Sequence, residues 1–331
     1  MRKKKCELRN TPEEPMPARI MVSSRSSMLL RVQDYDLAAT LDSGQAFRWQ
    51  ERPGGWHGVI GEHWVRLTQL PEGIRAEVAA PVKSWGWLQV YLQTDVDLTA
   101  VLKTFPDDAP MRAAVAACRG LRVLRQDPWE CLASFILSST KQIVQIRQII
   151  SLLCERFGEP VAVPAGAPGA FAFPAPEKIA GLAEADLRAC KMGFRAPHLL
   201  AAARQIATGT LDVGRWRELP MAEARAELMK LRGVGSKIAD CVLLFAGGFD
   251  AAFPVDVWVE RALRRLYFPN RRVTARHLHR FTATHFGPHA GHAQQYLFHY
   301  MRTKMNYSRA KLAKRGKNDP PLPGCFARDP K

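Results

Sequence analysis

A lysine and an aspartate in the C-terminal half of the chain are the residues best suited to covalent chemistry. Lys237 lies where a helix is expected to begin, and Asp256 follows a Pro-Val turn further along the chain. An amine at a helix start lies at the positive end of the helix dipole, and burial further disfavours its charged form. A neutral amine can attack a sugar C1′ atom and form a Schiff base, while a carboxylate stabilises the positive charge that develops on the sugar. We therefore predict that Lys237 and Asp256 are catalytic.

The segment before Lys237 has the pattern Leu-x-Gly-Val-Gly between two helical patterns, which is typical of a helix-hairpin-helix. Gly233 and Gly235 permit positive φ angles, so that backbone N–H groups, with that of Val234 among them, can approach a phosphate closely. The hairpin is a candidate clamp for the DNA backbone. Plainer interpretations stay open, because non-enzymatic DNA-binding modules also carry such hairpins. Lys237 could be a solvated cation, and Asp256 could merely cap the next helix.

The charge balance favours a polyanionic partner. The 331 residues include 48 Lys and Arg against 31 Asp and Glu, for a formal net charge of +17. Seven cations and three anions lie in residues 1–28, and nine cations and two anions lie in residues 302–331, so the two ends carry +11 of this charge and the rest +6. Such a surplus is typical of proteins that bind nucleic acid.

Other classes of protein are disfavoured by what the sequence lacks. There is no apolar run long enough to cross a membrane and no recognisable signal peptide. The seven cysteines are scattered without a metal-binding pattern. We therefore expect an intracellular protein without a cofactor, in the cytoplasm or nucleoid of a bacterium or in the nucleus of a eukaryote.

Hydrophobic patterning predicts an α+β protein between two irregular ends. Residues 1–28 lack periodicity and are predicted to form a disordered basic leader, and residues 307–331 a basic tail. Short alternating runs over residues 29–78, separated by turns, predict an antiparallel sheet, and after residue 85 the pattern is helical. We expect an antiparallel sheet domain with flanking helices over residues 29–120, followed by a helical domain over residues 121–306.

Helix limits can be placed within the second domain. Asp127, Pro128 and Glu130 supply the N-cap, first-turn proline and capping glutamate of one helix. A second apolar stripe is predicted to end at Gly158, and residues 161–176, rich in Ala, Pro and Gly, are predicted to form a loop between helical lobes.

Five separated motifs resemble those of the 8-oxoguanine glycosylase/lyase branch of the helix-hairpin-helix (Gly/Pro/Asp) superfamily of DNA glycosylases. Besides the hairpin with its aspartate, they are residues 41–49 (LDSGQAFRW), 126–132 (QDPWECL), 192–196 (MGFRA) and 287–291 (GPHAG), the last followed by Gln294 and Phe298. The resemblance covers most of the chain. It implies base excision repair, in which 8-oxoguanine is flipped from duplex DNA, released by attack of Lys237 on C1′, and the strand cut by β-elimination. Some relatives hold an iron–sulfur cluster near the C-terminus, where this chain has only Cys325.

The resemblance also implies the residues of a base pocket. Phe298 would stack on the damaged base opposite Cys241. Gln294 would contact its Watson–Crick edge, and the carbonyl of Gly44 would accept the N7–H group that only 8-oxoguanine carries. Helical spacing agrees, because Gln294 and Phe298 are four residues apart, as are Lys237 and Cys241, so that each pair lies on one helix face. Taken singly, the same residues could be core, surface and turn residues.

Two further segments are expected to meet the DNA where the base has left the stack. Phe194 is implied as the wedge that enters the gap, beside Arg195. Thr140, Lys141 and Gln142 stand where the better-known eukaryotic members have three asparagines. Asparagine offers both a donor and an acceptor, whereas Thr140 has one hydroxyl and Lys141 only donors, so the departure predicts a looser preference for the base opposite the lesion. The alternative is that the amide of Gln142 takes over from its neighbouring position.

A second departure is Trp258, where those members have a histidine, which alters the wall beside Asp256. Two alternatives stay open: a glycosylase for alkylated or other damaged bases, and a non-catalytic helix-hairpin-helix protein. Lys237 separates these classes best, because a passive binder needs no amine there. The expected partner is double-stranded DNA that contains oxidised guanine, bound by a monomer.

Overall fold

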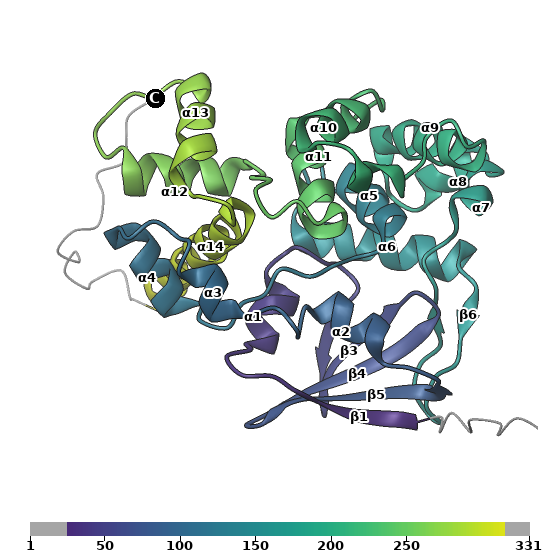
Figure 1. Cartoon of the computed structure of the whole chain (residues 1–331). Coiled ribbons are helices and arrows are strands. Elements are labelled where there is room, and N and C mark those ends of the chain that lie inside the picture. Colours follow the sequence, from purple (N-terminus) through teal and green to yellow (C-terminus); the bar gives the residue numbers. More distant parts are fainter. Residues whose placement is uncertain (1–24, 315–331) are drawn as a thin grey trace, which may run out of the picture.

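The computed structural model describes the backbone of residues 25–314 and the side chains of residues 26–303. A five-stranded antiparallel sheet lies below two lobes of helices (Figure 1). The predicted α+β class is therefore confirmed. Residues 1–24 of the predicted leader and residues 315–331 of the predicted tail lie outside the described residues. No helix in the described part of the chain is long and apolar enough to cross a membrane.

The sheet has the strand order β1-β5-β4-β3-β2. Its strands are β1 (Arg25–Arg31), β2 (Gln50–Arg52), β3 (Gly55–Ile60), β4 (His63–Leu70) and β5 (Gly73–Val82). Strands β2 to β5 form the predicted meander, and β1 pairs with β5. Residues 25–28 thus belong to an edge strand, which corrects their assignment to the leader. The polar sequence hides this strand because Ser26 and Ser27 are exposed at the sheet edge.

One face of the sheet is buried against α1 (Leu37–Asp42) and α2 (Gly86–Leu92). Val65 and Leu67 on β4, and Ile74 and Ala76 on β5, are fully buried at alternating positions, as a half-buried strand requires. Leu41 of α1 belongs to the same core. The loop that follows α1 is therefore anchored on the sheet.

The first helical lobe surrounds α5, in which every residue from Cys131 to Leu137 is buried. A helix that is apolar on all sides belongs in a core. The elements of this lobe are α5 (Pro128–Leu137), α6 (Ile143–Phe157), β6 (Pro160–Val161), β7 (Ala170–Phe171), α7 (Pro176–Ala180), α8 (Glu184–Ala189), η1 (Gly193–Arg195), α9 (Ala196–Ala207), η2 (Arg215–Glu218), α10 (Met221–Met229), α11 (Ser236–Val242) and the π-helical turn η3 (Leu243–Gly247).

The predicted helix limits in this lobe are largely confirmed. Asp127 caps α5 by accepting a hydrogen bond from the N–H of Glu130 (2.8 Å), and α6 ends with Gly158 as its C-cap. The side chain of Glu130 does not complete a capping box, because it pairs with Arg48 (3.3 Å). The predicted loop 161–176 contains one unexpected feature, the short ladder of β6 and β7.

The second lobe combines helices from both ends of the chain. They are α3 (Leu98–Leu102), α4 (Ala109–Ala117), α12 (Val257–Tyr267), α13 (Ala275–His285) and α14 (Ala290–Lys314). Met111 of α4 shares one core with Leu263 of α12 and Leu297 of α14. We expected residues 98–117 to flank the sheet, whereas they pack with these C-terminal helices.

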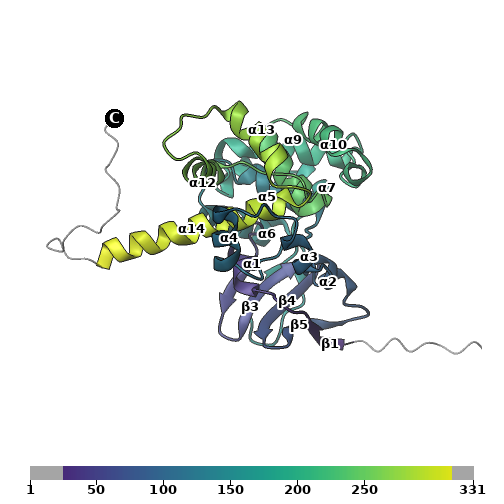
Figure 2. The same cartoon turned by 60° about the vertical axis from the view of Figure 1, so that its left-hand side comes forward.

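Helix α14 extends well beyond the body of the protein (Figure 2). It continues to Lys314, so the prediction that a tail begins at residue 307 is wrong for residues 307–314. The physical reason is that the sequence has no glycine or proline between Gly291 and Gly316 that would stop a helix. Near its start, the N–H of Gly291 donates to the carbonyl of Asp250 (2.7 Å), in the segment that crosses from η3 to α12.

Candidate active site

Lys237 lies in the first turn of α11, directly after the hairpin, and is half-buried. Its Nζ donates a hydrogen bond to Oγ of Ser138 (3.3 Å) and lies 5.2 Å from the centre of the Phe135 ring. Both partners belong to the C-terminal end of α5 and are uncharged. Lys237 forms no ion pair with any residue that the structure describes. The amine is therefore held by neutral groups that leave its reactivity available.

Asp256 is the N-cap of α12. Its Oδ1 accepts hydrogen bonds from the N–H groups of Trp258 (2.9 Å) and Val259 (2.8 Å), which leaves Oδ2 for other partners. Burial raises the pKa of the Asp256 carboxyl above its ordinary value, while the helix amides and the positive charge of Lys237 oppose the shift. The plain capping interpretation is thus correct, and it is compatible with catalysis because the cap fixes the orientation of the carboxylate.

Cys241 lies one turn after Lys237 and is 3% exposed. Burial raises the pKa of its thiol to about 12, although Lys237 acts in the opposite direction. A thiol with this pKa is neutral at physiological pH and is a poor nucleophile. Cys241 can therefore form an uncharged wall beside Lys237 without competing with the amine.

Helix α14 carries Gln294 and Phe298 on one face. Gln294 is 4% exposed, and its buried Oε1 has no hydrogen-bond partner among the described residues. A buried amide oxygen without a partner is costly unless a ligand or a water molecule satisfies it. Gln294 is accordingly a good candidate for contact with a polar ligand.

Gly44 follows α1 and adopts a φ of +82°, which favours glycine. A Cβ atom at this position would lie 3.5 Å from Cε1 of Phe298 and only 2.9 Å from Cδ1 of Ile143. The structure therefore brings Gly44 against Phe298, although the two are far apart in sequence. The backbone conformation favours glycine here, and a Cβ would also displace the tip of the Ile143 side chain.

The predicted hairpin lies between α10 and α11, but its glycines differ. Gly233 has a φ of +86°, whereas Gly235 has an extended φ of −98°, so only Gly233 uses the positive φ that both glycines permit. The N–H of Val234 donates to the carbonyl of Leu231 (3.0 Å), which makes it unavailable to a phosphate. No atom lies within 4 Å of a Cβ placed at Gly235. The absence of a side chain thus leaves open space at the start of α11, where helix amides can receive an anion.

The two glycines make separable predictions. Gly233→Ala should lower stability and weaken binding to damaged and undamaged duplexes alike, because its Cβ would clash with the His198 ring and the left-handed backbone costs ~1 to 2 kcal/mol. Gly235→Ala should keep the wild-type unfolding temperature and lose affinity only. Calorimetry and fluorescence anisotropy on both duplexes measure these effects. Wild-type affinity in Gly235→Ala would show that no phosphate approaches this point.

Arg195 joins the two segments that are predicted to meet the DNA where the base has left the stack. One holds Phe194, and the other holds Thr140. Phe194 in η1 is 56% exposed, whereas Arg195 is 2% exposed. The guanidinium of Arg195 donates to the carbonyl of Ser139 and to Oγ1 of Thr140 (2.5 Å). Thr140 itself is exposed, with a φ of +58°. The wedge segment and the segment that replaces the three asparagines are therefore neighbours.

The next two residues of that segment begin α6. Lys141 is half-buried, and Gln142 is an exposed N-cap whose N–H donates to Oε1 of Gln145 (3.1 Å). The side chain of Gln142 is exposed at the surface. Both residues follow Thr140 directly, which places all three at the same end of α6.

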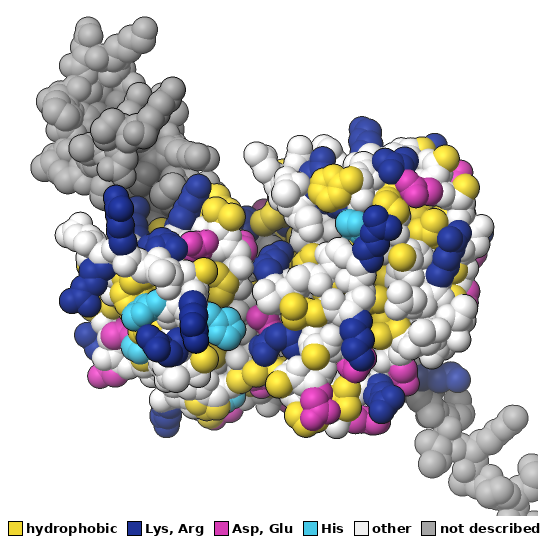
Figure 3. All heavy atoms as spheres, turned by 90° about the horizontal axis from the view of Figure 1, so that it is seen from above, with side chains coloured by type: hydrophobic (Ala, Val, Ile, Leu, Met, Phe, Trp, Pro, Cys, Tyr) yellow, Lys and Arg dark blue, Asp and Glu magenta, His cyan; other side chains and the backbone are white. Residues whose placement is uncertain are grey.

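Two features of the site had no sequence signal that we used. The first is Ser138, the hydrogen-bond partner of Lys237, for which the only signal is a serine at the end of an apolar helix. The second is a hollow of about 830 Å³ beside α12, which Trp258 and Phe268 line together with Arg261, Arg264, Arg265, Arg271 and Arg272. Lys and Arg side chains lie on both lobes of the face seen in Figure 3. Among the described residues, no group of three or more His, Cys, Asp and Glu is arranged to hold a metal ion.

Comparisons with known proteins match both parts of the chain. Residues 27–132 match the family described as 8-oxoguanine DNA glycosylase, N-terminal domain, and residues 133–286 match the HhH-GPD superfamily base excision DNA repair proteins. A probable N-glycosylase/DNA lyase of Methanothermobacter thermautotrophicus is 30% identical over 306 residues, which cover 83% of this chain and 96% of that protein.

Two further comparisons agree. The N-glycosylase/DNA lyase OGG1 of Arabidopsis thaliana is 29% identical over 79% of this chain and 76% of that protein. The crystal structure of the Clostridium acetobutylicum 8-oxoguanine glycosylase/lyase, in complex with double-stranded DNA containing cytosine opposite to 8-oxoguanine, has a TM-score of 0.78 and 30% identity. That similarity covers 84% of this chain and 98% of the Clostridium chain. The similarity to the Clostridium protein therefore extends over both the sheet and the helical lobes.

Proposed function

Because this chain belongs to the 8-oxoguanine glycosylase branch of the HhH-GPD superfamily of base excision DNA repair proteins, we propose that it excises 8-oxoguanine from duplex DNA and then cleaves the strand. We assign Lys237 as the nucleophile and Asp256 as the stabilising carboxylate. The observation that carries this assignment is the amine of Lys237, held by Ser138 without an ion pair among the described residues. The carboxylate of Asp256, which caps the next helix, interacts electrostatically with this amine.

In the proposed first step, the glycosidic bond of a flipped nucleotide breaks and its electron pair leaves with the base, which takes up a proton. Positive charge develops at C1′, where the carboxylate of Asp256 stabilises it. Lys237 gives up its ammonium proton, which the departing base can take up, and the free amine forms a bond to C1′; opening of the sugar ring then gives a Schiff base. Loss of a proton from C2′ and departure of the 3′ phosphate then cut the strand.

Base recognition would use the groups that converge around Gly44. The carbonyl of Gly44 would accept the N7–H of 8-oxoguanine, which guanine lacks. The unpartnered Oε1 of Gln294 supports a contact of that side chain with the edge of the base. Phe298 and Cys241 would cover the two ring faces, because one is an aromatic beside Gly44 and the other a neutral thiol beside Lys237.

Borohydride trapping tests the proposal directly, because only a Schiff base to an amine becomes a permanent cross-link. A duplex with 8-oxoguanine opposite cytosine should give a covalent complex that runs slower on a denaturing gel. Undamaged duplex and duplex with an alkylated base are the controls. Base release without trapping would favour a monofunctional glycosylase, and binding without either would favour a passive helix-hairpin-helix protein.

The base opposite the lesion offers a prediction for Thr140. A β-branched residue with positive φ is strained, whereas asparagine tolerates this conformation and offers both a donor and an acceptor. Thr140→Asn should therefore sharpen the preference for cytosine by about tenfold, since a well-placed polar pair is worth ~1 to 3 kcal/mol in base recognition. Single-turnover excision of 8-oxoguanine opposite each of the four bases measures this.

The result for Thr140 also tests the neighbouring residues. Gln142→Ala in the same assay shows whether that exposed amide contributes to the preference. Strict cytosine preference in the wild type, unchanged in Thr140→Asn and Gln142→Ala, would assign recognition of the opposite base to residues outside this segment. We further propose that the protein acts on DNA as a monomer, which gel filtration of the free protein and of its DNA complex would check.

A further inference from the structure

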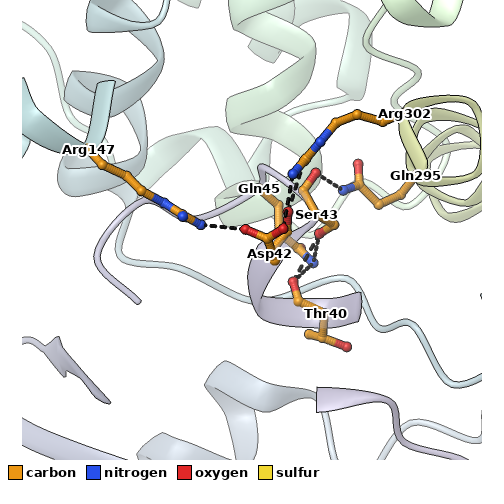
Figure 4. Close-up of polar contacts among 7 residues, drawn as sticks. All are labelled: Thr40, Asp42, Ser43, Gln45, Arg147, Gln295 and Arg302. Carbon is orange, nitrogen blue, oxygen red and sulfur yellow. Dashed lines mark hydrogen bonds and ion pairs between the residues drawn. The ribbon is translucent and has the colours of Figure 1, made fainter. Parts of the chain in front are cut away.

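A single carboxylate connects three elements around Gly44 (Figure 4). Asp42, the last residue of α1, accepts hydrogen bonds from two arginines that belong to different lobes. Oδ2 of Asp42 accepts from Arg302 of α14 (3.0 Å), and Oδ1 accepts from Arg147 of α6 (2.9 Å). Arg302 also donates to the backbone carbonyl of Asp42 (2.8 Å). One guanidinium thus holds both the side chain and the main chain of Asp42.

The residues on either side of Gly44 are fixed as well. The carbonyl of Ser43 accepts a hydrogen bond from Nε2 of Gln295 (3.2 Å), on α14. Gln45 is fully buried, and its Nε2 donates to the carbonyls of Thr40 (3.0 Å) and Arg122 (2.7 Å). Gly44 therefore lies between two anchored neighbours, and two of the anchoring side chains come from α14 (Figure 4).

The same two helices carry the groups that contact Gly44. Arg302 lies four residues after Phe298 on α14, and Arg147 lies four residues after Ile143 on α6, so each arginine shares a helix face with a contact of Gly44. The hydrogen bonds from Arg302 to Asp42 consequently also fix the distance between the Gly44 loop and the Phe298 ring, because Arg302 and Phe298 lie on the same helix. Every one of these contacts joins segments that are distant in sequence.

Electrostatics make the arrangement sensitive to each partner. Burial lowers the pKa of Arg302 from its ordinary value, Asp42 opposes this shift, and Arg147 adds to it. The side chains of Arg147 and Arg302 are only 27% and 19% exposed, so water screens them incompletely. Without Asp42 nothing would compensate the repulsion between these two guanidiniums.

We propose that Asp42, Arg147 and Arg302 form a clamp of positioning residues that sets the discrimination of 8-oxoguanine from guanine. The proposal rests on the function proposed above, because the two bases differ at N7, the position that the Gly44 carbonyl would contact. A hydrogen bond of this kind depends steeply on distance and angle. Release of the clamp would therefore affect lesion selectivity more than it affects the covalent chemistry at Lys237.

Variants of Arg302 test the clamp. Arg302→Leu should reduce the ratio of affinities for 8-oxoguanine and guanine duplexes by about tenfold, the scale of one lost hydrogen bond to the discriminating group. Arg302→Lys keeps the charge but cannot hold the carbonyl and the carboxylate together, so an intermediate ratio is expected. Arg66→Leu is the matched control, because it breaks an Arg–Glu77 pair of similar geometry within the sheet (2.7 Å). The control should keep the wild-type ratio.

Two reaction rates distinguish a loss of base recognition from an overall loss of enzyme activity. Strand cleavage at a preformed abasic site needs Lys237 but no recognition of a base. In Arg302→Leu, excision of 8-oxoguanine should fall at least about tenfold more than cleavage of the abasic site, on the same hydrogen-bond scale. Equal falls in the two rates would overturn the clamp. A wild-type enzyme that does not excise 8-oxoguanine would instead overturn the proposed function.

A double-mutant cycle completes the test. If Asp42 and Arg302 act as one unit, the double variant Asp42→Asn/Arg302→Leu should lose no more selectivity than the worse single variant. Multiplying losses would mean that the two residues act independently and would contradict a shared clamp. Selectivity at the wild-type level in both single variants would also contradict a shared clamp.

Discussion

Replacing Lys237 with alanine is expected to abolish both base release and borohydride trapping, while binding to duplex DNA is largely kept. The physical reason is that Lys237 is the amine placed beside Ser138 and Asp256, and the neighbouring Cys241 stays a neutral thiol at physiological pH. Single-turnover assays and trapping on one 8-oxoguanine duplex measure both losses. Anisotropy on the same duplex measures binding.

Lys230→Ala is the matched control for this experiment. Lys230 follows α10 at the start of the same hairpin, but its side chain is 69% exposed and pairs with Glu227 (2.6 Å). The control removes the same charge without touching the proposed site, so base release and trapping should persist. Base release at the wild-type rate in Lys237→Ala would contradict the covalent mechanism, whatever the control shows.

Replacing Asp256 with asparagine is expected to slow excision by about 10² or more, the scale for removal of one preorganised electrostatic group. Asparagine can still accept hydrogen bonds from the N–H groups of Trp258 and Val259, so the cap of α12 should survive. Asp97→Asn is the control, because Asp97 caps α3 through the same two backbone positions, Thr99 and Ala100. The control should excise at the wild-type rate.

The pH dependence of Asp256 gives an independent check. Burial raises the pKa of this carboxyl above its ordinary value of 3.8. Because the reaction needs the carboxylate, the acidic limb of the rate profile should lie above that value and disappear in Asp256→Asn. Stability depends on pH in the opposite direction to activity. A raised pKa means that the folded state binds the Asp256 proton more tightly than the unfolded state does. The contribution of Asp256 to stability is therefore lost as pH rises through the pKa of the folded state.

At neutral pH, Asp256→Asn should therefore be at least as stable as the wild type while being far less active. Thermal unfolding of both proteins across the acidic range measures this contrast. A wild-type excision rate in the variant would reduce Asp256 to a helix cap, and a marked loss of stability at neutral pH would mean that the cap itself requires the charge.

Local patterns in the sequence predicted local structure well. Asp127 and Pro128 start α5 as expected, and Gly158 ends α6. The hairpin pattern was correct in place but not in detail, because a Gly-Val-Gly run does not reveal which glycine takes the positive φ. The first residues of β1 were not predicted, since the exposed serines carry no alternation. The length of α14 was not predicted either, since its basic residues suggested a tail.

Contacts between distant segments could not be predicted in the same way. The spacing of Lys237 and Cys241 follows from one helix, but the hydrogen bond from Lys237 to Ser138 joins residues 99 apart. Asp42 and Arg302 are separated by 260 residues. The packing of α3 and α4 with α12 to α14 is of this kind too. Such pairs depend on the tertiary arrangement, which periodicity and capping signals do not specify.

Three residues with separate proposed roles lie on one face of α14, so the register of this helix positions all of them together. Gln294, Phe298 and Arg302 follow one another at intervals of four residues. Each residue of an α-helix advances the side-chain direction by roughly 100°. A single inserted residue before Gln294 would turn all three away together, whereas one between Phe298 and Arg302 would uncouple the clamp from the aromatic ring. Single substitutions in α14 can therefore change the selectivity for 8-oxoguanine in small steps, whereas an insertion before Arg302 moves whole side chains out of the site.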